Sequence, residues 1–306
     1  MENCFELPMQ KKFRLAVFTD LHIDGLDLPG TWKAKQHLRQ HVRALQPGLA
    51  VVLGDTALCW GNHLRTRGFV RMMDALATPW TAVLGNHEGE SRLEVSRRNV
   101  LRAYQASRHF LGNCELPGVA GYGNQCIVLS HQSRPVQLLF FLDSGGKGGH
   151  DYVQPSQLDW MTRTAARYPG TPGMVFLHVP PWQFKAAQEA LHTGTAQLLD
   201  GALRESVCTA GTQAQSDALV ATCKTLGVWA IVAGHDHAND FDIAWQGMRY
   251  IYAQSGGYSR ICYDARSQGV RGCTVFVFDN HGVVQIRRLR EHANKGLCKV
   301  VQRPSL

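Results

Sequence analysis

The sequence has 306 residues, of which 44% are hydrophobic and 18% are charged. This composition is typical of a globular protein with ample material for a sizeable core. The formal net charge of +8 favours acidic partners such as phosphate esters, but the basic residues are spread out and no nucleic-acid-binding motif appears.

Targeting and export signals are not visible in the sequence. No apolar run approaches the roughly 20 residues that span a bilayer, and the first 20 residues lack a basic region followed by an apolar one. Nine cysteines are scattered without a C-x-x-C pair, which favours reduced thiols, and no Asn-x-Ser/Thr sequon occurs. We therefore expect a cytoplasmic protein without a membrane span; its oligomeric state stays open.

In chain order, short apolar strand patterns alternate with helical patterns. The predicted strands are 14–19, 49–54, 80–85, 137–143, 173–178, 228–234, 249–254 and 274–279, and a last one lies in the basic tail. The predicted helices are 31–46, 64–77, 92–109, 155–168 and 213–226. Near-continuous apolar strands between helices indicate an α/β layered fold whose sheets are buried on both faces. The later strands follow one another with fewer helices, which favours a mixed or antiparallel sheet there.

No internal repeat or low-complexity linker divides the chain. We predict a single domain over 1–306, with its core in 13–290. Segment 185–215 is rich in small residues and resists assignment; we interpret it as a candidate mobile cover over one edge.

Polar side chains follow five of the predicted strands, at the point where each strand ends. They are Asp20 and His22, Asp55, Asn86 to Glu88, His178, and His235 to His237. A single buried histidine is more often a core residue than a ligand, and Gly-Asp after a strand is usually a turn. Five such strand ends together favour a metal site, because the carboxyl ends of strands in α/β sheets converge on one edge.

Carboxylates, an amide oxygen and imidazoles form a hard-to-borderline donor set without thiolate. Such a set suits manganese, iron or zinc. Seven donors are too many for one tetrahedral ion but fit two divalent ions that share a bridging carboxylate, as in two-metal hydrolases.

The ordered motifs "DLH", "GD", "GNHE", "LH" and "GHDH" resemble those of the calcineurin-like metallophosphoesterase superfamily. The stretches "PWTAVLGNHEGES", "LLFFLDSGG" and "GHDHANDF" look like its purple-acid-phosphatase-related branch without a secretion signal. The resemblance implies a four-layer αββα sandwich of two mixed β-sheets flanked by helices, with a dinuclear centre between the sheet edges.

The resemblance also implies a role for each motif residue. Asp20, His22 and His237 would hold one metal ion, and Asn86, His178 and His235 the other, with Asp55 bridging both. His87 resembles the catalytic histidine that protonates the leaving alkoxide or binds the phosphate. Outside the ligand set, Glu88 and Asp236 would orient neighbours. We interpret Tyr258 and Arg260, in a glycine-rich loop, as candidate substrate-binding residues, with Arg260 clamping a phosphate; a surface turn explains this loop equally well.

One position departs from the purple acid phosphatases. In those enzymes a tyrosine follows the "GD" aspartate by three positions and gives the purple colour when bound to ferric iron. Leu58 stands there in this sequence, and His22 supplies a neutral imidazole instead. This departure favours divalent ions.

We therefore expect a phosphatase for phosphate monoesters in which a metal-bridging hydroxide attacks phosphorus in line. A phosphodiesterase on the same centre, and a non-catalytic interaction module that has kept the fold, are the alternatives. The substrate, a phosphorylated small molecule or a phosphoprotein, is left open by the sequence.

Overall fold

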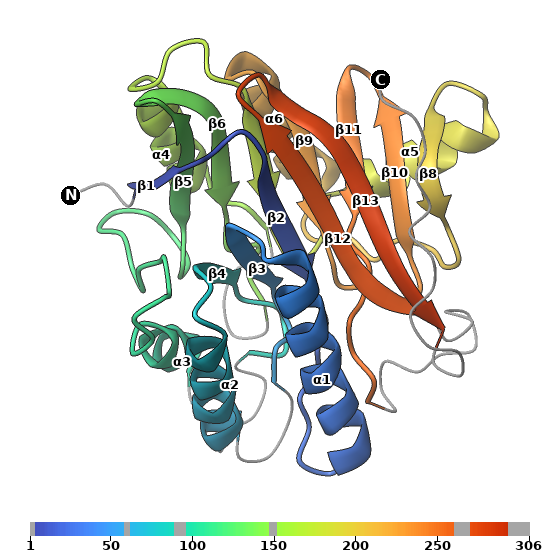
Figure 1. Ribbon diagram of the computed structural model, residues 1–306. Coiled ribbons are helices and arrows are strands. Elements are labelled where there is room, and N and C mark those ends of the chain that lie inside the picture. The colour runs from blue at the N-terminus through green and yellow to red at the C-terminus, as the bar shows by residue number, and fades with distance from the viewer. Residues whose placement is uncertain (1–3, 58–61, 89–95, 147–151, 260–269, 293–306) are drawn as a thin grey trace.

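The computed structural model of the protein describes residues 4–57, 62–88, 96–146, 152–259 and 270–292. Two β-sheets pack against each other, and helices cover the outer face of each sheet (Figure 1). This is the four-layer αββα sandwich that the sequence predicts.

The smaller sheet has five strands in the order β13-β12-β2-β3-β4. Its strands are β2 (Phe13–Phe18), β3 (Leu49–Leu53), β4 (Trp80–Val83), β12 (Val270–Asp279) and β13 (Gly282–His292). Strands β2, β3 and β4 are parallel, whereas β12 is antiparallel to both β2 and β13. The helices on its outer face are α1 (Leu28–Leu45), α2 (Asn62–Leu76) and α3 (Arg97–Tyr104).

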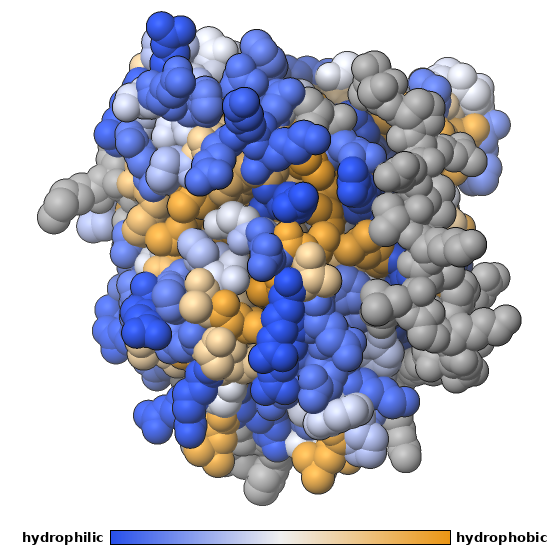
Figure 2. All heavy atoms as spheres, viewed as in Figure 1, coloured by the Kyte–Doolittle hydropathy of each residue, from blue (hydrophilic) through white to orange (hydrophobic). Residues whose placement is uncertain are grey.

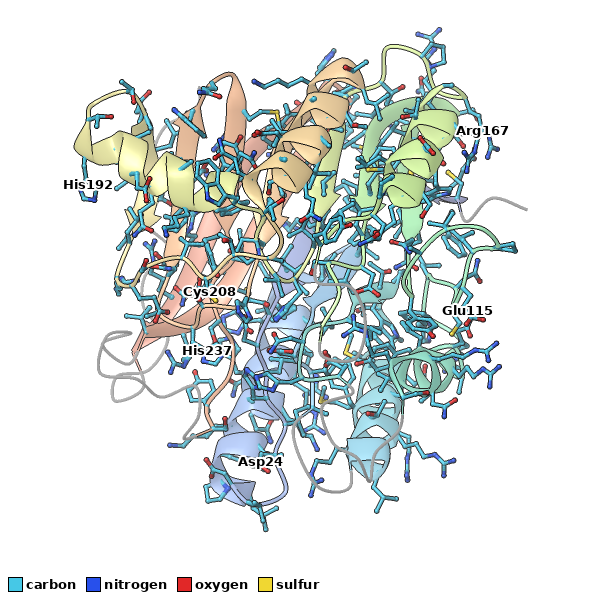
Figure 3. All side chains as sticks on the ribbon, turned by 180° about the vertical axis from the view of Figure 1, so that it is seen from behind. Asp24, Glu115, Arg167, His192, Cys208 and His237 are labelled. Carbon is cyan, nitrogen blue, oxygen red and sulfur yellow. The ribbon has the colours of Figure 1, made fainter. Side chains whose placement is uncertain are left out.

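The larger sheet has eight strands in the order β1-β5-β6-β7-β9-β11-β10-β8. They are β1 (Cys4–Pro8), β5 (Gln125–His131), β6 (Arg134–Phe141), β7 (Gly173–Phe176), β8 (Gln197–Ala202), β9 (Val228–Ala233), β10 (Asp240–Trp245) and β11 (Met248–Tyr252). Neighbours β6, β7, β9 and β11 are parallel, and β10 pairs antiparallel with β11 and β8. Seen from behind, α4 (Pro155–Ala165), α5 (Gln183–His192) and α6 (Gln213–Thr225) cover this sheet (Figure 3).

The apolar strands are continuous because each central strand is buried on both sides. In β3, Leu49, Val51 and Leu53 face the core between the two sheets. Ala50 and Val52 of the same strand face the helices α1 and α2. Since side chains alternate between the two faces of a strand, both sets are apolar only when both faces are covered.

The structure confirms the eight strands predicted between 14 and 279, the helices predicted between them, and the mixed pairing in the second half. The sequence did not predict β1, β5, β8, β10 or α5. Segment 185–215 contains most of α5, the edge strand β8 and the start of α6, so it has regular structure; its mobility stays a prediction. His37 and His41 stand in a helical pattern outside the predicted site, for which the sequence predicts solvated side chains, but both are buried on α1.

The surface is mostly polar, with apolar residues gathered in a band across the middle of one face (Figure 2). Several large apolar side chains are exposed near the start of α1 and α2, namely Leu26, Leu28, Trp32 and Leu64. Among the described residues, the helices are too short or too polar to cross a bilayer.

Candidate metal centre

The seven predicted ligands come together where the carboxyl ends of five strands meet. Asp20 and His22 follow β2, Asp55 follows β3 and Asn86 follows β4, all in the smaller sheet. The larger sheet supplies the rest: His178 follows β7, and His235 and His237 follow β9. His237 lies beyond the lower ends of these strands, close to Cys208 (Figure 3). The site therefore lies between the edges of the two sheets.

Asp20, His22 and His237 form one group of donors. The Nε2 atoms of His22 and His237 are 2.9 Å apart. Asp20 Oδ1 lies 3.7 Å from His237 Nε2 and 3.9 Å from His22 Nε2. One oxygen and two nitrogens thus surround a point to which a single cation would bind.

Asn86, His178 and His235 form the second group, together with Asp55. His178 Nε2 lies 3.2 Å from Asn86 Oδ1 and 3.2 Å from Asp55 Oδ2. One donor atom each from Asp55, His178 and His235 lies within 4.8 Å of the others. Asp55 Oδ2 is also 3.7 Å from His22 Nε2, in the first group. Its carboxylate therefore stands between the two groups, where a bridging ligand is needed.

The protonation of His22, His235 and Asp55 fits ligands for cations. Burial lowers the pKa of His22 to about 3 and that of His235 to about 4, so both imidazoles are neutral near pH 7. Burial opposes the charge on Asp55, but the facing His178 and His22 outweigh it and hold the pKa of that carboxyl well below its usual range. Burial would likewise lower the pKa of His178, yet Asp55 and Asp20 raise it to about 10.

Ring nitrogens of His178 and His235 indicate that the centre fits metal cations. His178 Nδ1 lies 2.8 Å from the carbonyl oxygen of Leu53, so Nδ1 carries a proton and Nε2 is the ring nitrogen that faces the other ligand residues. The Nδ1 atom of His235 is buried and has no hydrogen-bond partner in the described part of the chain. A cation between the two groups would satisfy such atoms and replace the positive charge that the carboxylates otherwise draw onto His178. The residues present therefore fit two divalent ions.

The backbone is bent sharply at the strand ends to bring these side chains together. Four of the ligand residues have positive φ, which non-glycine residues adopt rarely: Asp20 (54°), His22 (42°), Asp55 (49°) and His235 (89°). Such conformations cost free energy and gather at functional sites. A Cβ at Gly54 would collide with the His178 ring, and one at Gly85 would collide with the Asp55 carboxylate. Glycine at these two positions lets the ligands approach each other.

His87 lies beside the centre with its ring toward the open side. Its backbone N–H donates to Asp55 Oδ1 at 3.0 Å, and its ring Nε2 lies 3.9 Å from Asp55 Oδ2. The side chain is 28% exposed, whereas that of Asp55 is 1% exposed. The imidazole is thus held next to the bridging carboxylate and can be reached by a substrate.

Glu88 and Asp236 form hydrogen bonds that hold the backbone of the ligand loops, and their role in orienting neighbours of the metal ligands stays a prediction. The buried Glu88 carboxylate accepts hydrogen bonds from the backbone N–H groups of Gly85, Asp55 and Thr56, at 2.6, 3.0 and 2.5 Å. Burial raises its pKa. Asp236 accepts from the hydroxyl of Tyr252 at 2.6 Å and from the N–H of Cys208 at 3.0 Å.

Of the two candidate substrate-binding residues, Tyr258 lies in the described part of the chain. The Tyr258 hydroxyl lies 3.4 Å from His37 Nδ1 on α1, so the loop packs on that helix. A role for Tyr258 in substrate binding stays a prediction. Arg260 lies outside the described residues, as does Leu58.

Sequence reasoning missed three residues that position the ligands. Thr19 donates to Asp20 Oδ2 at 2.8 Å. The buried Arg97 donates to the carbonyl of Gly85 and to Asp143 Oδ1. Tyr252 donates to Asp236 and accepts from its N–H. Only Thr19 carried a signal, since it directly precedes a predicted ligand.

A match to a family model identifies the architecture. The model described as "Calcineurin-like phosphoesterase" matches residues 13–239, a range that contains all seven ligand residues and His87. The chain belongs to the calcineurin-like phosphoesterase family. The family and the donor clusters together indicate a dinuclear centre for divalent metal ions, and a hydrolase.

The chain is similar at low sequence identity to individual curated proteins. It is 26% identical over 255 residues to "Probable inactive purple acid phosphatase 14" of Arabidopsis thaliana, covering 72% of this chain and 61% of the relative. It is 25% identical over 264 residues to "Phosphatase DCR2" of Saccharomyces cerevisiae, covering 75% of this chain and 45% of that protein. The chain thus spans less than two thirds of these relatives.

A solved structure supports the fold. A dimetal phosphatase from Danio rerio superposes with a TM-score of 0.56 at 14% identity, covering 91% of this chain and 95% of that one. At this identity the likeness concerns the fold alone.

Proposed function

We propose that the protein is a phosphatase that hydrolyses phosphate monoesters with two divalent metal ions. The main support is that the accessible imidazole of His87 lies next to Asp55, whose carboxylate stands between the two groups of metal ligands. The two groups of metal ligands alone would be sufficient for a protein that binds metal ions without catalysing a reaction. An exposed proton carrier beside them is what hydrolysis of an ester requires.

When bound, two divalent ions would activate water and neutralise phosphoryl oxygens, which is the chemistry that such pairs supply. Within the chain, Asp55 offsets the charge of two neighbouring cations. Glu88 fixes the backbone of Gly85 and Asp55, and thereby the distance between the ligand loops. His87 holds a proton at a ring nitrogen for the leaving oxygen of the ester.

A phosphodiesterase uses the same centre, so the donor set does not separate the two activities. A metal-binding protein without turnover is the second candidate. It is favoured by the names of three Arabidopsis relatives, each called a "Probable inactive purple acid phosphatase". Against it, this chain has both the complete donor set and His87.

The deciding experiment is a metal-reconstituted activity screen. The purified chain is loaded with Mn²⁺, Zn²⁺ or Fe²⁺ and assayed with 4-nitrophenyl phosphate and with bis(4-nitrophenyl) phosphate, then with phosphorylated metabolites and phosphopeptides. We expect faster hydrolysis of the monoester. Faster hydrolysis of the diester would establish the phosphodiesterase, and two bound ions without turnover on any ester would establish the inactive module.

A further inference from the structure

Two cysteines lie next to each other on β1 and β5, away from the metal centre. Cys4 and Cys126 are register partners in the parallel β1–β5 pair. Neighbouring strands are about 4.7–4.9 Å apart, inside the roughly 4.4–6.8 Å Cα separation at which disulfides form. Both side chains pack against the same core cluster, under α4, so both thiols lie on one face of the sheet.

The surroundings of Cys4 favour its thiolate. Its Sγ lies 3.5 Å from the hydroxyl of Tyr168. The guanidinium of Arg167 lies over the Tyr168 ring, 5.7 Å from the ring centre. The hydrogen bond with Cys126 lowers the pKa of Cys4 to about 7 against the effect of burial, and Tyr168 and Arg167 act in the same direction.

The other described thiols are placed differently. Cys208 is exposed, but partial burial of its sulfur and the nearby Asp236 raise the pKa of its thiol. Burial raises the pKa of Cys223 to about 12, and burial followed by the neighbouring Cys4 raises that of Cys126 well above its usual range. Half-buried Cys4 is therefore better suited to react than exposed Cys208, because the thiolate is the nucleophile.

Oxidation of this pair would act on the edge of the larger sheet. Strand β1 is an edge strand that pairs with β5 over five residues. Arg167 lies at the opposite end of the molecule from His237 (Figure 3). A bond between Cys4 and Cys126 would tie β1 to the sheet without touching the metal ligands.

We propose that Cys4 and Cys126 form a reversible dithiol–disulfide pair that hydrogen peroxide oxidises. The Cys4 thiolate attacks one peroxide oxygen, the O–O bond breaks and hydroxide leaves, so that Cys4 becomes a sulfenic acid. The Cys126 sulfur then attacks the Cys4 sulfur; the S–O bond breaks, and the hydroxyl leaves as water with the Cys126 proton. The two thiols supply the two electrons that reduce one peroxide.

The first test is alkylation of the reduced, folded chain with limiting iodoacetamide at pH 7, read peptide by peptide. We expect Cys4 to react at least about fivefold faster than Cys208, since roughly half of a thiol with a pKa near 7 is ionised. Tyr168→Phe removes a hydrogen-bond partner of the sulfur and should slow Cys4 about threefold. Faster labelling of Cys208, or no effect of Tyr168→Phe, would overturn the proposal.

The second test is oxidation with one equivalent of hydrogen peroxide, followed by peptide mapping without reduction. We expect peptides of Cys4 and Cys126 joined by a disulfide that dithiothreitol reverses. Cys126→Ala should leave Cys4 as a sulfenic acid that dimedone traps, formed more slowly because the hydrogen bond that lowers the pKa of Cys4 is lost. The folding of this variant is checked by circular dichroism, and Cys208→Ser serves as the control with normal cross-linking. Loss of both thiols without a Cys4–Cys126 cross-link contradicts the pair. If Cys126→Ala does not fold, the wild-type peptide map alone decides.

Discussion

Asp55 stands between the two donor groups, and its replacement should affect both. Asp55→Asn keeps the size of the side chain but removes the negative charge that offsets the repulsion between two cations. We expect the purified variant to hold fewer than two ions per chain and to lose at least about 10²-fold in turnover, as metal hydrolases do when the metals are no longer held in place. Metal analysis and turnover are measured on the same preparation.

The matched control for this prediction is His235→Ala, which removes a ligand of one group only. Its metal content should exceed that of Asp55→Asn. An Asp55→Asn protein that binds two ions and turns over normally would show that Asp55 does not bridge.

His87 should matter for turnover and not for metal binding. It lies beside Asp55 yet is partly exposed, so it faces the substrate side. We expect His87→Ala to keep its metal content while turnover falls by about 10²–10⁴-fold, the usual range for a general acid. The fall should be smaller for aryl than for alkyl phosphates, because aryl leaving groups need less protonation. Equal falls for both esters would assign His87 to phosphate binding or to structure.

At the residue scale, the sequence predicts those side chains whose type is unusual for their position. His22, His178 and His235 stand at the ends of buried strands, where turns normally have other residues. Arg97 gives no such signal, because arginine is common on a helix. His37 and His41 were wrongly expected to be solvated; the sequence does not show that β12 and the loop around Tyr258 pack against that side of α1.

At the scale of elements, β13 joins the smaller sheet to the far edge of the larger one through ion pairs. Arg290 donates to Asp240 Oδ2 at 2.6 Å, and Arg288 donates to Asp200 Oδ2 at 2.7 Å. Asp240 is fully buried and also accepts from the N–H of Ala202 on β8 at 3.0 Å. The pairs therefore connect β13, β10 and β8.

Removing one buried partner should weaken this connection. Asp240→Ala leaves Arg290 and the N–H of Ala202 without their acceptor, and we expect it to lower the free energy of unfolding by about 3 kcal/mol, the low end for a broken buried pair because Arg290 is partly exposed. Urea denaturation measures the change. Asp159→Ala, an exposed position on α4, is the control and should change stability little. Equal stability of the two variants would contradict a structural role for the pair.

The elements that sequence predicted best are those with two buried faces. Strands β3, β7 and β9 have apolar residues on both sides and are read directly from the sequence. The edge strands β1 and β8 lack that pattern, since none of their residues is fully buried. Their place in the sheet depends on pairing with distant residues, which local pattern does not encode.

At the scale of the whole molecule, this protein should differ from the purple acid phosphatases in its visible absorption. Leu58 stands where those enzymes have their iron-binding tyrosine. The hydroxyls of Tyr252 and Tyr258 are directed to Asp236 and His37. We predict a colourless protein that is active with divalent ions such as manganese and is insensitive to mild reductants.

A visible spectrum after aerobic purification from iron-rich medium tests the prediction of colour. No band in the purple region is expected, and activity should survive ascorbate. A strong band that disappears on reduction would mean that another tyrosine, with Tyr258 as the first to test, binds ferric iron.

The ligands of the proposed centre come from both sheets: Asp20, His22, Asp55 and Asn86 from the smaller, and His178, His235 and His237 from the larger. Each ion would therefore cross-link two layers that otherwise adhere through apolar side chains. Folding and occupancy are then thermodynamically linked, and ions at about 100 times their dissociation constant would add roughly 2.7 kcal/mol per site. Chelation should lower the melting temperature, and Asp55→Asn should weaken that response. A cell poor in the native ion would hold less of the folded protein as well as less activity, so that metal supply would set its abundance.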